Sequence, residues 1–135
     1  MLDCIFCDII TKNREGHFIY EDAHHVAFLD KYPIDKGHAL VVPKQHHEKI
    51  TDMEESKVGE LFSNIPRIAR AIMKTTGAVA FSLAQNNGRA AKQIIPHVHV
   101  HIIPRYAEMG AVWTKRTIPS VEELDVLAAQ IKANF

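Results

Sequence analysis

Residues 97–103 alternate histidines with apolar residues, reading His-Val-His-Val-His-Ile-Ile between Pro96 and Pro104. Successive side chains of a β-strand point to opposite faces, so the run predicts a strand over 96–103, closed by Pro104, with three imidazoles on one face. Same-face neighbours on such a strand are about 6.5–7 Å apart. Because burial of an unpaired polar group costs about 1–3 kcal/mol, a plain core strand explains this pattern poorly.

Three neighbouring imidazoles suit two kinds of chemistry. Two or three histidines on one strand can bind a catalytic zinc ion that keeps one position open for water. A histidine with an unperturbed pKa near 6.5 is also largely neutral at pH 7, so one ring nitrogen has a free lone pair and can act as a nucleophile. From spacing alone, His97, His99 and His101 fit a metal site and a nucleophilic site equally well.

The other predicted strands are short β-rich runs. The first two are separated by a polar turn and form a hairpin, and Pro43 ends the third. A polar turn over 85–88 precedes the histidine strand. The four runs cover 17–20, 26–30, 38–42 and 78–83.

Apolar residues at three- and four-residue spacing predict a long central helix over 51–76. Thr51 with Glu54 resembles a capping box at its start. Pro66 lies inside the pattern, where we expect it to kink the helix or divide it in two, and Gly77 is expected to end it.

A C-terminal helix is predicted over 120–132, with Ser120 and Glu123 as its capping box. Strands at hairpin distances together with these helices predict the α+β class. The expected architecture is a mainly antiparallel five-stranded sheet with a long central helix and a C-terminal helix on one face.

Composition favours one domain and argues against a global charge effect. A chain of 135 residues with 47% hydrophobic residues fits a single domain over 1–135. Sixteen Lys and Arg balance sixteen Asp and Glu, so no overall field attracts nucleic acid or an anionic membrane. Because no apolar run approaches the roughly 18 residues that span a bilayer, we expect a cytoplasmic protein without nucleic-acid or membrane partners.

Cys4 and Cys7 are separated by two residues, which lets both sulfurs reach one tetrahedral Zn²⁺. A redox Cys-x-x-Cys pair is the competing interpretation, but such pairs usually lie in a thioredoxin-like βαβ unit that this pattern lacks. We therefore favour zinc. Three further histidines match no motif and are expected on the surface: His17, His24 and His25.

Residues 97–103 match the His-φ-His-φ-His-φ-φ signature of the histidine triad (HIT) family of nucleotide hydrolases and transferases. Segments 28–30, 37–46 and 86–88 extend the resemblance, in order, over most of the chain. It implies a HIT-like fold and cleavage of a purine nucleotide at its α-phosphate, with a dinucleoside polyphosphate or a nucleoside phosphoramidate as substrate. It also implies a homodimer whose sheets join.

The same resemblance implies catalytic roles for three histidines. His99 attacks the α-phosphate to give a nucleotidyl-histidine intermediate, which water then hydrolyses. His101 and His38 contact the phosphate and position its oxygens.

The nucleotide-binding residues implied by the resemblance come from three segments. Asp30 accepts from the ribose hydroxyls, Phe28 lies at the base, and Asn86 lies near the phosphate. Gln93 belongs to the segment before the triad and completes the set. Each of the first three also has a plainer interpretation, as a strand-end aspartate, a core aromatic and a turn residue.

Family members with an N-terminal Cys-Ile-Phe-Cys pattern hold zinc through the two cysteines, the histidine of Pro-Lys-x-His and the first triad histidine. By this resemblance the ligands here are Cys4, Cys7, His46 and His97, with His47 as the adjacent alternative to His46. A closed Cys₂His₂ shell makes the zinc structural rather than catalytic.

The segment before the triad departs from the family pattern. Many relatives have Gly-Gln-Ser or Gly-Gln-Thr where this chain has Lys92-Gln93-Ile94. Ile94 lacks the hydroxyl that lies near the leaving group in relatives, and Lys92 is either a solvated loop lysine or a positive charge beside a polyphosphate tail. On the second interpretation we expect dinucleoside polyphosphates to be cleaved at least as well as phosphoramidates. Two alternatives to a nucleotide hydrolase or transferase remain: a nucleotide-binding module with marginal turnover, and a zinc hydrolase that uses the three histidines as ligands.

Overall fold

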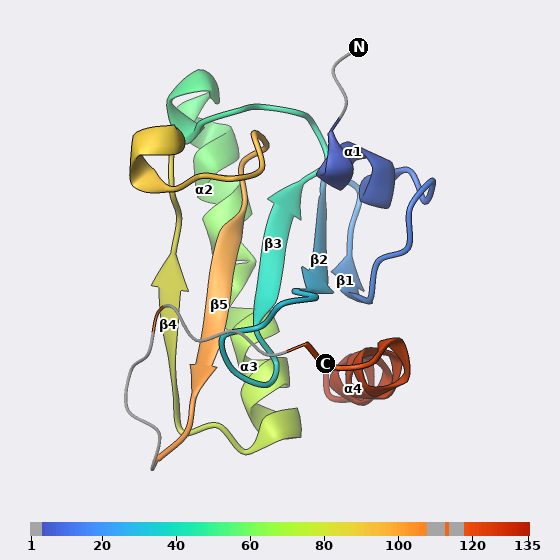
Figure 1. The fold of residues 1–135 in the computed structure, drawn as a ribbon. Helices are drawn as coiled ribbons and strands as arrows, with labels where there is room; N and C mark the ends of the chain where they lie inside the picture. Colours follow the sequence, from blue (N-terminus) through green and yellow to red (C-terminus); the bar gives the residue numbers. More distant parts are fainter. Residues whose placement is uncertain (1–3, 108–112, 114–117) are drawn as a thin grey trace.

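The computed structural model describes residues 4–107, 113 and 118–135. One five-stranded sheet forms its centre, with the order β1-β2-β3-β5-β4 and every neighbouring pair antiparallel (Figure 1). The strands are β1 (Phe18–Glu21), β2 (His25–Leu29), β3 (Ala39–Pro43), β4 (Ala80–Ala84) and β5 (Val100–Arg105). The predicted class and the mainly antiparallel five-stranded sheet are confirmed.

Within the described residues, four α-helices and two 3₁₀ turns surround the sheet. They are α1 (Ile5–Ile10), η1 (Ile50–Asp52), α2 (Glu55–Ser63), α3 (Ile65–Thr76), η2 (Arg89–Ala91) and α4 (Val121–Ala133). None of the helices in the described part of the chain is long and apolar enough to cross a membrane.

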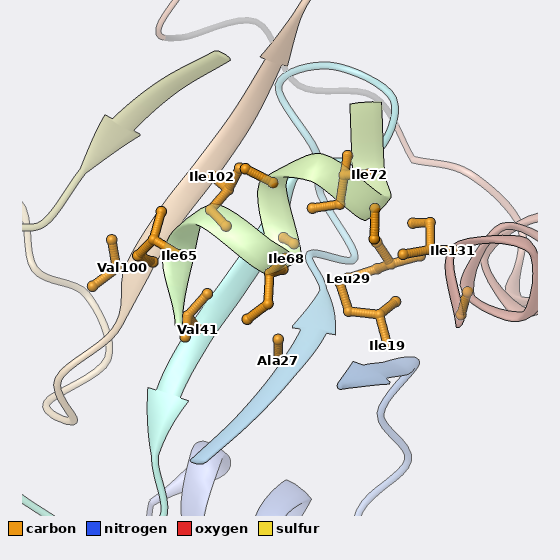
Figure 2. Packing of buried hydrophobic residues seen from close by; sticks show 14 of the residues in the cluster. Ile19, Ala27, Leu29, Val41, Ile65, Ile68, Ile72, Val100, Ile102 and Ile131 are labelled. Atoms are coloured by element: carbon orange, nitrogen blue, oxygen red, sulfur yellow. The ribbon is translucent and has the colours of Figure 1, made fainter. Parts of the chain in front are cut away.

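Two apolar clusters cover opposite faces of the sheet, because neighbouring residues of each strand point to opposite sides. On the helix face, strand residues pack against α3 and α4 (Figure 2): Ala27, Leu29, Val41, Val100 and Ile102 contact a group that includes Ile65, Ile68, Ile72 and Ile131. On the opposite face, which we call the α1 face, the cluster is Cys4, Phe6, Ile9, Val26, Phe28, Leu40 and Val42. The antiparallel register pairs His101 with Leu40, so His101 belongs to the α1 face.

The local signals at most helix ends act as predicted. Pro66 stands in the first turn of α3 and separates it from α2, since its missing N–H is tolerated only at a helix start. Gly77 ends α3 in a left-handed conformation, with φ of 76°. Ser120 and Glu123 form the capping box of α4. The capping box predicted for Thr51 is wrong, because Thr51 lies in η1 and α2 begins four residues later.

The histidine strand is shorter at its start than predicted and continues past Pro104. The N–H of Val98 bonds the carbonyl of His47 rather than a neighbouring strand, so regular pairing begins only at Val100. Pro104 lies inside β5 opposite Phe81 of β4. It is tolerated because β3 pairs with β5 only as far as Ile102.

Two of the histidines expected on the surface are buried. His17 is 3% exposed and bonds Asp125 of α4 through Nδ1 at 2.7 Å. His25 is also buried, between Asp22 and Asn64. The surface prediction is wrong for both because each ring forms hydrogen bonds with a residue from a distant part of the chain. His24 is exposed as expected.

Candidate functional site

His99 lies immediately before β5 and is 8% exposed. Its Nδ1 is 2.7 Å from the carbonyl oxygen of His97. A carbonyl only accepts, so Nδ1 carries the proton and Nε2 keeps its lone pair. Burial lowers the pKa of His99 below its ordinary value, which outweighs the opposing effect of the bond to the His97 carbonyl. The ring is therefore a neutral imidazole with a defined nucleophilic nitrogen.

His101 and His38 continue the row of imidazoles across the α1 face. The ring centroids of His99 and His101 are 5.0 Å apart, and those of His101 and His38 are 5.1 Å apart. The N–H of Ile34 donates to Nδ1 of His38, so a neutral His38 carries its proton on Nε2. That Nε2 lies 2.9 Å from Nδ1 of His101, which leaves the proton of a neutral His101 on its own Nε2.

Asp30 follows β2 and comes close to this row. Its Oδ2 is 3.6 Å from Nε2 of His38, and its Oδ1 accepts from the N–H of Tyr32. A cavity of about 360 Å³ opens beside Asp30 and His38, between residues 30–38 and α4. This volume lies in the range of about 300–1,000 Å³ typical of small-molecule sites. The cavity is lined on its other side by α4, however, and neither His99 nor His101 is among its lining residues.

Phe28 lies in the buried part of the α1 face. Its ring makes edge contacts with Phe6 at 5.4 Å and with Phe18 at 6.0 Å between centroids. The structure therefore places it in an aromatic cluster that continues to the histidines, which is compatible with a core role and with a base-binding role.

The segment between β4 and β5 contains the remaining predicted site residues. Asn86 is half-buried and lies before η2. Gln93 is buried, and both ends of its amide are used within the protein: Oε1 accepts from the N–H of Gly88 and Nε2 donates to the carbonyl of Glu48. Lys92 adopts a left-handed conformation at the end of η2, and Ile94 is 84% exposed.

A second cluster lies next to His99 and consists of Cys4, Cys7, His46 and His97. Nδ1 of His97 is 3.5 Å from Sγ of Cys4, 3.6 Å from Sγ of Cys7 and 3.1 Å from Nδ1 of His46. The ligand atoms of a tetrahedral zinc site are separated by about 3.3–3.8 Å, given the lengths of Zn–N and Zn–S bonds. The four side chains therefore fit a zinc ion, and His46 rather than His47 belongs to the cluster.

The chemistry of the cluster also suits a cation. Nε2 of His97 donates to the carbonyl of Pro43 at 2.8 Å, so Nδ1 faces the sulfurs with its lone pair. Burial lowers the pKa of His97 to about 4 and, with Cys4 close by, raises the pKa of the Cys7 thiol to about 11. A neutral imidazole is ready to bind a metal, whereas the thiol needs a cation to favour its ionised form.

The three triad imidazoles do not converge on one ion. His97 belongs to the cysteine cluster, His101 lies within 4.8 Å of Asp30 and His38, and His99 belongs to neither group. This arrangement does not support the zinc-hydrolase alternative, in which all three histidines would bind a single catalytic metal.

The sequence alone did not single out Phe6. This residue lies between the two cysteines, and its ring centroid is 4.9 Å from that of His99 and 6.0 Å from that of His97. The contact joins residues that are more than ninety positions apart, so nothing in the sequence around Phe6 predicts it.

Comparisons with known proteins agree with this geometry. A family model described as the HIT domain matches residues 11–108. An uncharacterized HIT-like protein of Methanocaldococcus jannaschii is 39% identical over 96% of this chain and 98% of its own length. The adenosine 5'-monophosphoramidase of Schizosaccharomyces pombe is 36% identical over 99% of each chain. An adenylylsulfatase of Arabidopsis thaliana is 40% identical over 86% of this chain, which spans 58% of that relative.

Among solved structures, a zinc-bound histidine triad family protein from Mycobacterium smegmatis superposes with a TM-score of 0.84 and 33% identity. The match covers 97% of this chain and 96% of that one. The similarity therefore includes the fold as well as the sequence.

Proposed function

Because the chain belongs to the HIT family, we propose that it cleaves a purine nucleotide at the α-phosphate through a nucleotidyl intermediate on His99. The observation that carries the proposal is the bond from Nδ1 of His99 to the His97 carbonyl, which leaves Nε2 as the attacking atom. The names of the two characterised relatives support nucleotide hydrolysis or transfer as the class of reaction.

In the first step, the Nε2–P bond forms and the bond from phosphorus to the leaving group breaks. Positive charge develops on the His99 ring, and the His97 carbonyl stabilises it through the bond it already accepts. Nε2–H of His101 donates a hydrogen bond to the leaving group, which takes its proton from water, while Nε2–H of His38 donates to Nδ1 of His101 and holds His101 in this tautomer. Water then attacks phosphorus, releases His99 and yields the nucleoside monophosphate.

We carry the binding residues over from the resemblance to the family. Asp30 and Phe28 would contact the ribose and the base, and Asn86 would contact the phosphate. Gln93 would act through the loop that bears Asn86, because its amide already joins Gly88 to Glu48. This arrangement supports a role for Gln93 in shaping the phosphate side of the site.

The cysteine cluster would hold a structural zinc. Cys4, Cys7, His46 and His97 supply the ligands, and the bound ion would fix α1 against the segment that carries His99. The zinc-bound relative from Mycobacterium smegmatis supports a metal at this fold.

A nucleotide-binding module with marginal turnover is the second candidate. It is favoured by one observation. Ile94 is apolar and 84% exposed, whereas many relatives have a serine or threonine at this position. A side chain that cannot donate to the leaving group would slow transfer without preventing nucleotide binding.

Single-turnover product analysis tests the proposal. Adenosine phosphoramidate and diadenosine tetraphosphate are incubated with the parent protein and with His99→Ala, in the presence of a chelator that leaves the tightly held zinc in place. We expect AMP and an acid-labile adenylylated protein from the parent and neither product from the variant. Tight AMP binding without turnover of either substrate would instead favour the binding module.

A further inference from the structure

Phe6 occupies the position where the cysteine cluster meets the nucleophile. It lies in α1 between Cys4 and Cys7, and its side chain is 5% exposed. The Sγ of Cys4 accepts from the N–H of Cys7, so the first turn of α1 is fixed by a sulfur that also contacts His97. The position of Phe6 is therefore determined by the cluster.

The ring of Phe6 is nearly perpendicular to the imidazole of His99, with an interplanar angle of 86° and 4.9 Å between centroids. Edge-to-face contacts in this distance range are the preferred arrangement of aromatic rings. The bond from Nδ1 to the His97 carbonyl fixes one direction of the imidazole but permits rotation about that direction. Contact with Phe6 restricts this remaining rotation.

We propose that Phe6 is a positioning residue for the nucleophile, which aims Nε2 of His99 at the phosphorus atom. The proposal rests on the proposed function and deepens it, because it assigns the cysteine cluster a link to the reacting nitrogen through one side chain. A displacement of about 1 Å of a reacting group is enough to slow a reaction by about 10²-fold.

The test compares Phe6→Leu with Phe18→Leu, both measured in protein of known metal content. The same substitution is made in each, but Phe18 contacts Phe28 and makes no ring contact with His99 among the described residues. At saturating diadenosine tetraphosphate, we expect Phe6→Leu to form adenylylated protein about 10- to 100-fold more slowly, with a half-saturating concentration within about twofold of the parent. Phe18→Leu is expected to keep the parent's rate.

A second readout needs no substrate. Three-bond couplings between the Hα and Hβ protons of His99, measured by NMR, report one rotamer when the ring is held and averaged values when it moves. We expect one rotamer in the parent and in Phe18→Leu, and averaging in Phe6→Leu. If Phe6→Leu does not fold, Phe6→Met replaces it, because methionine fills the volume without a ring.

Two results would overturn the proposal. A raised half-saturating concentration with an unchanged rate would make Phe6 a contact of the base, and a single His99 rotamer in the ring-less variant would show that Phe6 does not hold the imidazole. Absence of adenylylated protein from the parent would contradict the proposed function instead, while the NMR couplings would still decide the role of Phe6.

Discussion

The two nitrogens of each site imidazole have different partners, and the partner of one decides what the other can do. His99 donates from Nδ1, whereas His38 accepts at Nδ1 from the N–H of Ile34. These opposite arrangements give His99 a free lone pair and give His38 a proton to donate toward His101. His99 and His38 thus acquire distinct roles from the backbone groups beside them, and His101 acquires its role from His38.

His38→Asn separates these roles in one substitution. The asparagine Oδ1 takes the place of Nδ1 as acceptor for Ile34, but the side chain is too short to donate to His101. We expect transfer to His99 to slow by about tenfold, which is less than the 10²–10⁴-fold effect typical of a direct general acid. Single-turnover kinetics measures the rate, and an unchanged melting temperature shows that the fold is kept. A rate within twofold of the parent would show that the hydrogen bond from His38 to His101 does not assist the reaction.

The residue types of the site could be predicted from the sequence, but their protonation could not. The alternating histidines identified His99 and His101 as neighbours on one face. Which nitrogen bears the proton depends on the carbonyl of His97 and the N–H of Ile34. Almost every residue has these backbone groups, so the sequence does not show which of them will lie beside a given imidazole. The contact of Phe6 with His99 also needed the fold, because no local pattern predicts it.

At the scale of elements, we expect the stability of helix α1 to depend on the cysteine cluster. A six-residue helix is too short to be stable alone, so we expect its stability to come from the bound metal. Cys4→Ser should therefore lower zinc content and melting temperature together. A metal present at 100 times its Kd contributes about 2.7 kcal/mol to stability.

Elemental analysis and thermal melting of the same sample check this prediction. His47→Ala is the matched control, because His47 is next to the ligand His46 but lies outside the cluster. The control should keep the parent's zinc content and melting temperature. An unchanged zinc stoichiometry in Cys4→Ser would contradict the assignment of Cys4 as one of the four zinc ligands.

The turn between β1 and β2 depends on the carboxylate of Asp22. Burial raises its pKa, but bonds from the N–H groups of His24 and His25 and from the side chains of Tyr20 and His25 outweigh this effect and lower the pKa to about 2. Because the folded pKa lies below the ordinary 3.8, the stabilisation is complete above pH 4 and is lost as the pH falls toward 2.

Asp22→Asn should therefore destabilise the protein near neutral pH by about 1 kcal/mol, allowing for the partial exposure of the carboxylate. The difference from the parent should shrink between pH 4 and pH 2. Urea unfolding at several pH values measures it. A difference that stays constant over this range would show that the ionised carboxylate is not what stabilises the turn.

Three helix ends were predicted correctly from the sequence, whereas the start of β5 was not. Pro66, Gly77 and the Ser120–Glu123 pair act locally, so their effects are visible in a few residues of sequence. The start of β5 depends on where a neighbouring strand is available, and the N–H of Val98 bonds His47 instead. Strand pairing between distant segments is a tertiary property, which the alternation of His97 and His99 alone could not reveal.

At the scale of the whole molecule, β4 is an edge strand with an unusual surface. Among the described residues it pairs only with β5, and it lies at the end of the sheet away from α4 (Figure 1). Three alternate residues on and beside it are exposed although apolar: Val79 at 64%, Phe81 at 40% and Leu83 at 44%. Open edges of this kind tend to pair with another chain. We therefore expect a homodimer in which two β4 edges meet and these side chains become buried.

Leu83→Lys tests this arrangement because it places a charge within the expected interface and leaves the buried core unchanged. Sedimentation equilibrium should show a dimer for the parent and a shift toward monomer by at least tenfold in the dissociation constant for the variant, a difference of about 1.4 kcal/mol. Val126→Lys is the matched control, since Val126 is 59% exposed on α4, and it should remain dimeric. A monomeric parent would contradict the prediction, and a Leu83→Lys variant as dimeric as the parent would place the interface elsewhere.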